Sequence, residues 1–157
     1  MAASAASPTI PRDGNVLGFD VGSRRIGVAL GSSLTGARAL AVIDVRADGP
    51  DWAALARLQA EWRPVGLVVG DPLTLDGGDQ PNRKRAHAFA RQLHERWHLP
   101  VVMVDERSSS VEAAQRFARE RAEGRKRRRD AEALDAVAAA VIVERWMMTP
   151  DDAVPVP

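Results

Sequence analysis

The chain has 157 residues, 45% of them hydrophobic, which is enough to build the core of one ordinary domain but not of two. Cysteine is absent, which excludes disulfides and thiolate metal sites, so a bound metal ion would need oxygen or imidazole ligands. The formal net charge of +1 excludes the strongly basic character of a protein that coats DNA. The sequence has neither an apolar run of membrane-spanning length nor a secretory signal, so we expect a soluble, intracellular protein without a membrane partner.

The first half of the chain carries the pattern of strands followed by a helix. β-compatible runs separated by glycine-containing turns predict three consecutive antiparallel strands, at residues 16–19, 25–30 and 38–45. Residues 51–62 then show helical spacing, with Pro50 and Pro64 marking the limits of the helix.

The second half alternates between strands and helices. Two short, continuously apolar runs at 66–70 and 101–105 predict parallel strands that are covered on both faces. Between them, residues 82–98 carry a core-facing apolar stripe, and further helices are expected at 109–121 and 131–147. This order predicts an α/β fold with a five-stranded mixed sheet, three antiparallel strands followed by two parallel ones, and helices on both faces.

Both ends of the chain have compositions that disfavour regular structure. The first residues are rich in Ala, Ser and Pro, and the last eight contain three prolines and two aspartates. We therefore expect a disordered N-terminal tail over 1–14, one domain over 15–148 and a disordered C-terminal tail over 149–157.

Asp20 stands at the end of the first predicted strand, between glycines at 18 and 22. An unpaired charge in this position is costly to bury without a partner or a metal ion. Phosphodiester cleavage commonly uses two divalent ions held by converging carboxylates, and Mg²⁺ prefers oxygen ligands. We predict that Asp20 binds a metal ion; the alternative is a tight hairpin in which Asp20 caps its own turn.

Two further acids are candidates for the same site. Glu106 follows the strand at 101–105, and ligands of open α/β sheets gather at the carboxyl ends of such strands. Asp135 borders the apolar side of the last predicted helix. Asp130 and Glu132 lie at the start of that helix, where the helix dipole alone favours carboxylates, so Asp135 is the better ligand candidate.

Asp71 and the histidines are less specific signals. Asp71 follows the strand at 66–70, again at the ligand-binding end, although a loop rich in turn residues is also consistent with a simple connection. His94 and His98 have the i, i+4 spacing of a zinc pair. Together with His87 they border an apolar stripe, which is typical of a solvated helix face, so we predict no zinc site there.

One stretch of the chain is strongly basic. From 116 to 129 there are eight basic residues against two glutamates, and 124–129 is the densest part. Such a segment is able to hold a phosphate backbone, although a solvated charged loop is an equally ordinary interpretation.

Four segments of the sequence resemble the YqgF family, also called RuvX. They are Gly18-Phe-Asp-Val-Gly-Ser-Arg-Arg-Ile-Gly-Val-Ala29, the loop Gly70-Asp-Pro-Leu-Thr-Leu-Asp-Gly77, Asp105-Glu-Arg-Ser-Ser-Ser110 and Leu134-Asp-Ala-Val-Ala-Ala139. The resemblance runs from about residue 15 to 147. It implies an RNase H-like fold and a bacterial cytoplasmic protein, described in the family as a Holliday junction resolvase and as a nuclease that matures the 5′ end of pre-16S ribosomal RNA.

Carried over motif by motif, the family's metal-binding carboxylates fall on Asp20, Glu106 and Asp135. The sequence departs from the family pattern in two places. Family members usually have a nonacidic residue where Asp71 stands and often Asn at position 74, which leaves open whether Asp71 is an additional carboxylate of the site. The Asp-Glu-Arg motif usually continues into two threonines, which Ser109 and Ser110 replace.

We therefore predict an RNase H-like nuclease in which three carboxylates hold two Mg²⁺ or Mn²⁺ ions that activate water for attack on phosphorus. The residues expected to position the nucleic acid are Arg24, Arg25, Arg107, Ser109, Arg125, Lys126, Arg127, Arg128 and Arg129. Structured RNA is the favoured partner over branched DNA, the ribosomal small-subunit precursor is a candidate for it, and the protein is expected to be a monomer or a weak homodimer.

Two other functions are compatible with the sequence. An Asp-x-Gly turn after a strand also resembles the phosphate loop of sugar kinases and actin-like ATPases, but those proteins need a second domain to close over ATP. A nucleic-acid-binding or ribosome-assembly factor could also retain the carboxylates without cutting.

Overall fold

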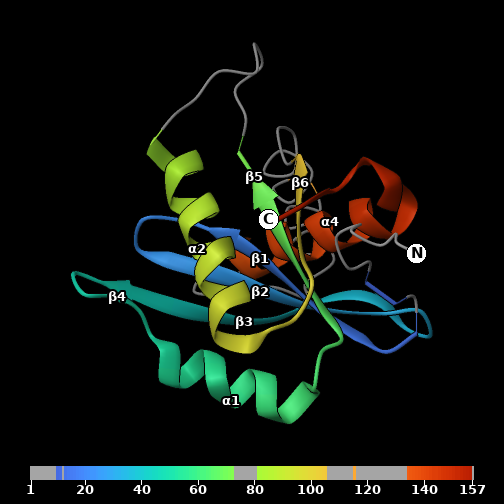
Figure 1. The fold of residues 1–157 in the computed structure, drawn as a ribbon, viewed down its shortest axis with the longest axis horizontal. Coiled ribbons are helices and arrows are strands. Elements are labelled where there is room, and N and C mark those ends of the chain that lie inside the picture. Colours follow the sequence, from blue (N-terminus) through green and yellow to red (C-terminus); the bar gives the residue numbers. More distant parts are fainter. Residues whose placement is uncertain (1–9, 12, 73–80, 106–114, 116–133, 157) are drawn as a thin grey trace, which may run out of the picture.

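The computed structural model describes residues 10, 11, 13–72, 81–105, 115 and 134–156. In this part of the chain a seven-stranded sheet has the strand order β4-β3-β2-β1-β5-β6-β7 (Figure 1). The strands are β1 (Asn15–Val21), β2 (Arg25–Ser32), β3 (Gly36–Arg46), β4 (Gly49–Pro50), β5 (Gly66–Asp71), β6 (Val101–Asp105) and β7 (Val154–Pro155). The central strand β1 is antiparallel to β2 and parallel to β5.

The predicted order of three antiparallel strands and then two parallel ones is confirmed by β1 to β3 and by β5 and β6. The predicted number of five strands is wrong, because β4 pairs with the end of β3 and β7 pairs with β6. Each added strand has only two residues, too few to show an alternating pattern. Each also contains a proline at an edge of the sheet, where a missing N–H disrupts few ladder bonds.

Described residues near both ends of the chain contact the sheet. Residues 149–156, expected to belong to a disordered tail, form the 3₁₀ helix η3 (Pro150–Asp152) and strand β7. The Val156 N–H donates to the Val101 carbonyl at 2.9 Å, which continues the pairing. At the other end Ile10 is buried against Gly66, where a Cβ would come within 2.5 Å of the Ile10 side chain.

Three described helices cover the sheet on both faces, as predicted (Figure 1). α1 (Trp52–Trp62) and α2 (Pro81–Trp97) lie on one face, and α4 (Leu134–Met148) lies on the other. α1 begins after Asp51, whose side chain accepts a hydrogen bond from the Ala54 N–H at 3.1 Å, so this acid is its N-cap. The helix expected at 109–121 lies outside the described residues, except for residue 115. No helix among those described is long and apolar enough to cross a membrane.

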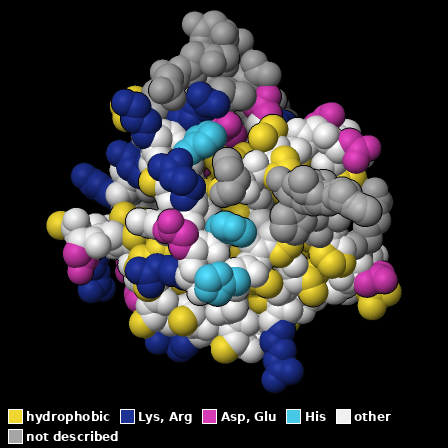
Figure 2. Space-filling model, viewed as in Figure 1, with side chains coloured by type: hydrophobic (Ala, Val, Ile, Leu, Met, Phe, Trp, Pro, Cys, Tyr) yellow, Lys and Arg dark blue, Asp and Glu magenta, His cyan; other side chains and the backbone are white. Residues whose placement is uncertain are grey.

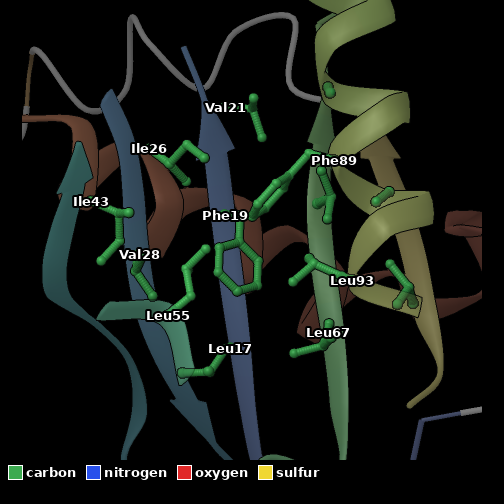
Figure 3. Close-up of a cluster of buried hydrophobic side chains, with 14 of the residues drawn as sticks. Leu17, Phe19, Val21, Ile26, Val28, Ile43, Leu55, Leu67, Phe89 and Leu93 are labelled. Atoms are coloured by element: carbon green, nitrogen blue, oxygen red, sulfur yellow. The ribbon is translucent and has the colours of Figure 1, made fainter. Parts of the chain in front are cut away.

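Alternating side chains of the central strand divide between the two faces. Leu17, Phe19 and Val21 pack toward α1 and α2 (Figure 3). In this layer the rings of Phe19 and Phe89 meet edge to face at 5.3 Å, and Trp52 stacks on Phe89 at 5.7 Å. The ring of Phe89 therefore joins β1, α1 and α2.

On the opposite face of the sheet, α4 packs closely against the strands. Ala136 through Val143 are all buried, and the sheet beneath them presents glycines of β1 and β2 in place of larger side chains. A Cβ at Gly18 would overlap the Val143 side chain, and a Cβ at Gly27 would overlap the backbone carbonyl of Asp135. The glycines therefore let the first turn of α4 rest directly on the sheet.

Candidate metal and nucleic-acid site

Asp20 is the next-to-last residue of β1, and its ladder partner in β2 is Gly27. Strand alternation directs its side chain toward the α4 face, away from Phe19 and Val21. The turn that follows is closed by backbone groups, because the Gly22 N–H donates to the Arg25 carbonyl at 2.9 Å. The ladder thus fixes the half-buried Asp20 carboxylate at the end of a central strand.

Asp135 reaches the same place from the far end of the chain. It lies in the first turn of α4, and its backbone carbonyl sits directly over Gly27. Because Gly27 is also the ladder partner of Asp20, the structure brings these two predicted ligands together around one glycine. Glycine is required there, since any side chain would separate α4 from β2.

Arg25 forms an ion pair with one of these two acids, Asp135. Its Nε donates to Oδ2 of Asp135 at 2.8 Å, with the two side chains 43% and 32% exposed. An ion pair this exposed contributes little to the free energy of folding. Its position is more informative, because it places a guanidinium beside one carboxylate of the predicted site. Arg24, also predicted to contact nucleic acid, is exposed in the adjoining turn.

The remaining predicted residues fall outside the described part of the chain. They are Glu106, Arg107, Ser109, Arg125, Lys126, Arg127, Arg128 and Arg129. The strand that leads to Glu106 is described: β6 ends at Asp105, whose backbone carbonyl accepts a hydrogen bond from Nη1 of Arg145 at 3.0 Å. Arg145 of α4 therefore ties the end of β6 to the helix that carries Asp135.

Asp71 lies on the other face of the sheet. It ends β5, is 8% exposed, and has Asp105 as its ladder partner in β6. The Arg83 Nε donates to its Oδ1 at 3.0 Å, and the His87 Nε2 lies 3.2 Å from its Oδ2. Both partners belong to α2, so Asp71 faces α2 while Asp20 faces α4. The sequence spacing did not predict that Arg83 and His87 both contact Asp71, although positions 83 and 87 are one helical turn apart.

The two described acids of the site have the chemistry that Mg²⁺ or Mn²⁺ takes in proteins. Asp20 and Asp135 offer carboxylate oxygens from two rigid elements, and the glycine between them lets the backbone of Asp135 approach β2 closely. Two carboxylates do not complete a two-ion site, and no group of three or more possible ligands is found among the described residues. The predicted third carboxylate is outside that set.

A family model described as "RuvX: Holliday junction resolvase" matches residues 14–149. The chain belongs to the RuvX family. A relative from Xanthomonas axonopodis pv. citri, named "Putative pre-16S rRNA nuclease", is 77% identical over 146 residues, which cover 92% of this chain and 94% of the relative. A relative of the same name from Xanthomonas campestris pv. campestris strain B100 is 75% identical with the same coverage.

Solved structures similar to this RuvX family member include junction resolvases. Thermus thermophilus RuvC in complex with a Holliday junction has a TM-score of 0.53 and 19% identity, over 90% of this chain and 98% of that chain. The fowlpox virus Holliday junction resolvase has a TM-score of 0.50 and 14% identity, over 87% and 98% of the two chains. At these identities the similarity establishes the fold alone.

Two histidines of this RuvX family member, His94 and His98, lie at and just beyond the end of α2. Residues 94–98 read His-Glu-Arg-Trp-His, which matches the H-E-x-x-H spacing of zinc proteases, glutamate included. However, α2 ends at Trp97, and His98 has a left-handed φ of 54° instead of a helical one. The His94 Nδ1 lies 3.0 Å from the Leu99 carbonyl, so this ring closes the end of the helix. The match to the zinc motif is therefore one of sequence only.

A cavity of about 780 Å³ lies at the other end of β1 and α4 from Asp20. It is lined by Ile10, Val102, Trp146, Met147 and Ser32, among others. Ser32 pairs with Asn15 at the start of β1, whereas Asp20 is near its end. The cavity therefore contributes nothing to the carboxylate site.

Proposed function

We propose that this RuvX family member is an RNase H-like, metal-dependent nuclease that hydrolyses phosphodiester bonds and acts in 5′-end maturation of pre-16S ribosomal RNA. The observation that carries the proposal is the meeting of Asp20 and Asp135 around Gly27. The names of relatives that are 75% to 77% identical over 92% of the chain support the substrate. This substrate would place the activity in the bacterial cytoplasm.

In the proposed site Asp20, Glu106 and Asp135 hold two Mg²⁺ or Mn²⁺ ions. When bound, such ions supply an activated water and stabilise the leaving oxygen of an in-line displacement at phosphorus. Asp20 binds from a central strand and Asp135 from the first turn of α4, so neither carboxylate depends on a loop for its position. Cleavage of the bond between phosphorus and the 3′ oxygen leaves a 5′-phosphate on the product.

Arg25 has two roles in this proposal. It orients the Asp135 carboxylate through the 2.8 Å hydrogen bond, and its partly exposed guanidinium places a positive charge that attracts a phosphate beside the scissile one. Arg24 in the adjoining turn adds a second exposed cation. Contacts of this kind position the backbone and carry little base specificity, so a structural feature of the RNA would select the cut.

The test is cleavage of an RNA that carries the 5′ end of pre-16S ribosomal RNA, in Mg²⁺ or Mn²⁺. Asp20→Asn should lower the rate by more than about 100-fold, because loss even of an outer partner of a metal ligand costs about 10- to 100-fold. Asp48→Asn makes the same change in charge at an exposed residue outside the site and should cut like wild type. Calorimetric titration with Mn²⁺ should show weaker binding to Asp20→Asn.

Several outcomes would contradict this proposal. If Asp20→Asn still cuts the RNA, the carboxylate site does not take part in the reaction. Metal binding without any cutting would favour a non-cleaving assembly factor that keeps the carboxylates. A four-way DNA junction is assayed in parallel, because the matching family model is described as a junction resolvase. Cutting of that junction in preference to the RNA would assign the site to branched DNA.

A further inference from the structure

The surface of α2 concentrates positive charge in a chain whose formal net charge is only +1. Its cations are Arg83, Lys84, Arg85, Arg91 and Arg96, against the single carboxylate of Glu95. Figure 2 shows Lys and Arg side chains gathered over this part of the molecule, with the histidines in a row beside them. The helix therefore presents a basic surface on the same face as α1.

Four residues of α2 form one stripe along the helix, which we call the α2 stripe: Lys84, His87, Arg91 and His94. Their spacing of three, four and three residues keeps them on one side of an α-helix. The buried residues Ala86, Phe89, Ala90 and Leu93 occupy the side that packs on the sheet. The α2 stripe thus borders the core-facing side and remains reachable from solvent.

The cations of α2 differ in the contacts that they make within the protein. Arg83 binds Asp71, Arg85 donates to Oδ1 of Asn82 at 2.8 Å, and Arg96 lies over the Trp52 ring at 3.9 Å. Lys84 and Arg91 are exposed, and neither has an ion-pair partner within the described part of the chain. They stand seven residues apart, which is about 10 Å along the helix axis.

The position of α2 relative to the carboxylate site is fixed. Asp71 ends β5, which pairs directly with β1, the strand of Asp20. Through Arg83 and His87 the Asp71 carboxylate holds the first two turns of α2 against this end of β5. The α2 stripe therefore starts near the sheet edge where β1 and β5 end and leads away from it across the molecule.

We propose that the α2 stripe binds the phosphate backbone of the nucleic acid through Lys84 and Arg91. This contact would lie on the face of the sheet that carries α2, opposite the face that carries α4. The inference rests on the proposed function and adds a surface for the part of the substrate that flanks the cut. A row of cations on a rigid helix, with few apolar groups exposed between them, matches a polyphosphate better than a protein surface. Contacts with phosphate oxygens would position the duplex and leave its sequence unread.

The experiment measures binding in chelator, so that it needs no cleavage. A fluorescently labelled RNA hairpin and a labelled DNA duplex are titrated with wild type and with the double variant Lys84→Ala/Arg91→Ala at several salt concentrations. The magnitude of the slope of log K against log [salt] should fall by about 0.7 to 0.9 for each phosphate that the variant no longer neutralises. The control Arg46→Ala/Arg57→Ala removes the same charge from exposed positions on β3 and α1.

An unchanged slope in the Lys84→Ala/Arg91→Ala variant would overturn the proposal, and so would an equal fall in the control variant. Circular dichroism melting should show that both variants remain folded, since each replaces exposed residues only. A reduced slope with RNA but not with DNA would assign the α2 stripe to RNA alone. If only the nuclease proposal fails, the protein will not cleave RNA in the presence of metal, but the difference in salt-dependence slope between wild type and Lys84→Ala/Arg91→Ala will remain.

Discussion

A carboxylate at the buried end of a strand needs partners, and Asp71 obtains two from α2. Arg83 and His87 each contact a different oxygen of Asp71, whose side chain is 11% exposed. A buried acceptor that is fully satisfied in this way stabilises the fold, whereas leaving its partners unpaired is costly. Asp71 therefore anchors α2 to β5, and it faces away from the metal ligands proposed on the α4 side.

Asp71→Asn tests this assignment. The substitution removes the charge that holds Arg83 and His87, so the free energy of unfolding should fall by about 1 to 3 kcal/mol, measured by urea denaturation. Cleavage of the pre-16S RNA fragment should continue, because Asp71 is not among the proposed ligands. Asp44→Asn, at an exposed position on β3, is the control and should leave the unfolding midpoint unchanged. A loss of cleavage as large as that of Asp20→Asn would show that Asp71 belongs to the metal site.

At the scale of elements, the packing of α4 on β1 and β2 decides where Asp135 lies. Gly18, Gly27 and Gly31 leave the sheet surface bare beneath the alanines and valines of the helix. The two glycines at 18 and 27 differ in what they meet. Gly18 faces the Val143 side chain, well along α4, while Gly27 faces the backbone of the first turn. The glycine at 27 thus controls the separation between Asp20 and Asp135.

Replacing each of the glycines at 18 and 27 by alanine should lower the stability of the fold in both cases, but should slow RNA cleavage strongly in only one of them. Gly18→Ala and Gly27→Ala both overfill a tight interface and should each lower the free energy of unfolding by about 1 to 3 kcal/mol. Gly27→Ala should in addition slow cleavage strongly, because the first turn of α4 must move away from β2. Single-turnover rates measured below both melting transitions would check this. Equal rates for the two variants would mean that the approach at Gly27 does not position Asp135.

At the scale of the whole molecule, the layer between the sheet and helices α1 and α2 depends on Phe89. Its ring contacts Phe19 of β1 and Trp52 of α1, so one side chain links three elements. Phe89→Ala should lower the free energy of unfolding by about 3 to 5 kcal/mol, a large fraction of the roughly 5 to 15 kcal/mol typical of a domain. Urea denaturation followed by tryptophan fluorescence measures the loss. Phe89→Leu keeps most of the buried area and should lose less; an equal loss would assign the effect to the aromatic contacts.

Much of the architecture could be predicted from the sequence because its long elements have clear periods. β5 and β6 are continuously apolar, and α2 carries its buried stripe at helical spacing, so their type and order were correct. The edge strands β4 and β7 could not be predicted, because two residues are too few to show a strand pattern, and the pairing of β7 with β6 joins segments that are distant in the sequence.

The candidate site was predictable in part for the same reason. Asp20 and Asp135 were selected from their places beside apolar runs, and the structure brings them together. The orientation of Asp71 was not predictable, since a single residue at a strand end gives no sign of which face it takes. Its partners Arg83 and His87 become visible only when α2 is docked on the sheet.

The placement of Asp135 over Gly27 also sets the moment at which the protein can become active. Chains are synthesised from the N-terminus, so β1, β2 and β3 can pair while the residues of α4 have not yet been added. Until then the Asp20 carboxylate has no Asp135 beside it. If the proposed function holds, a chain that is still being translated lacks part of its active site and is unable to cut the RNA of the ribosome that is making it.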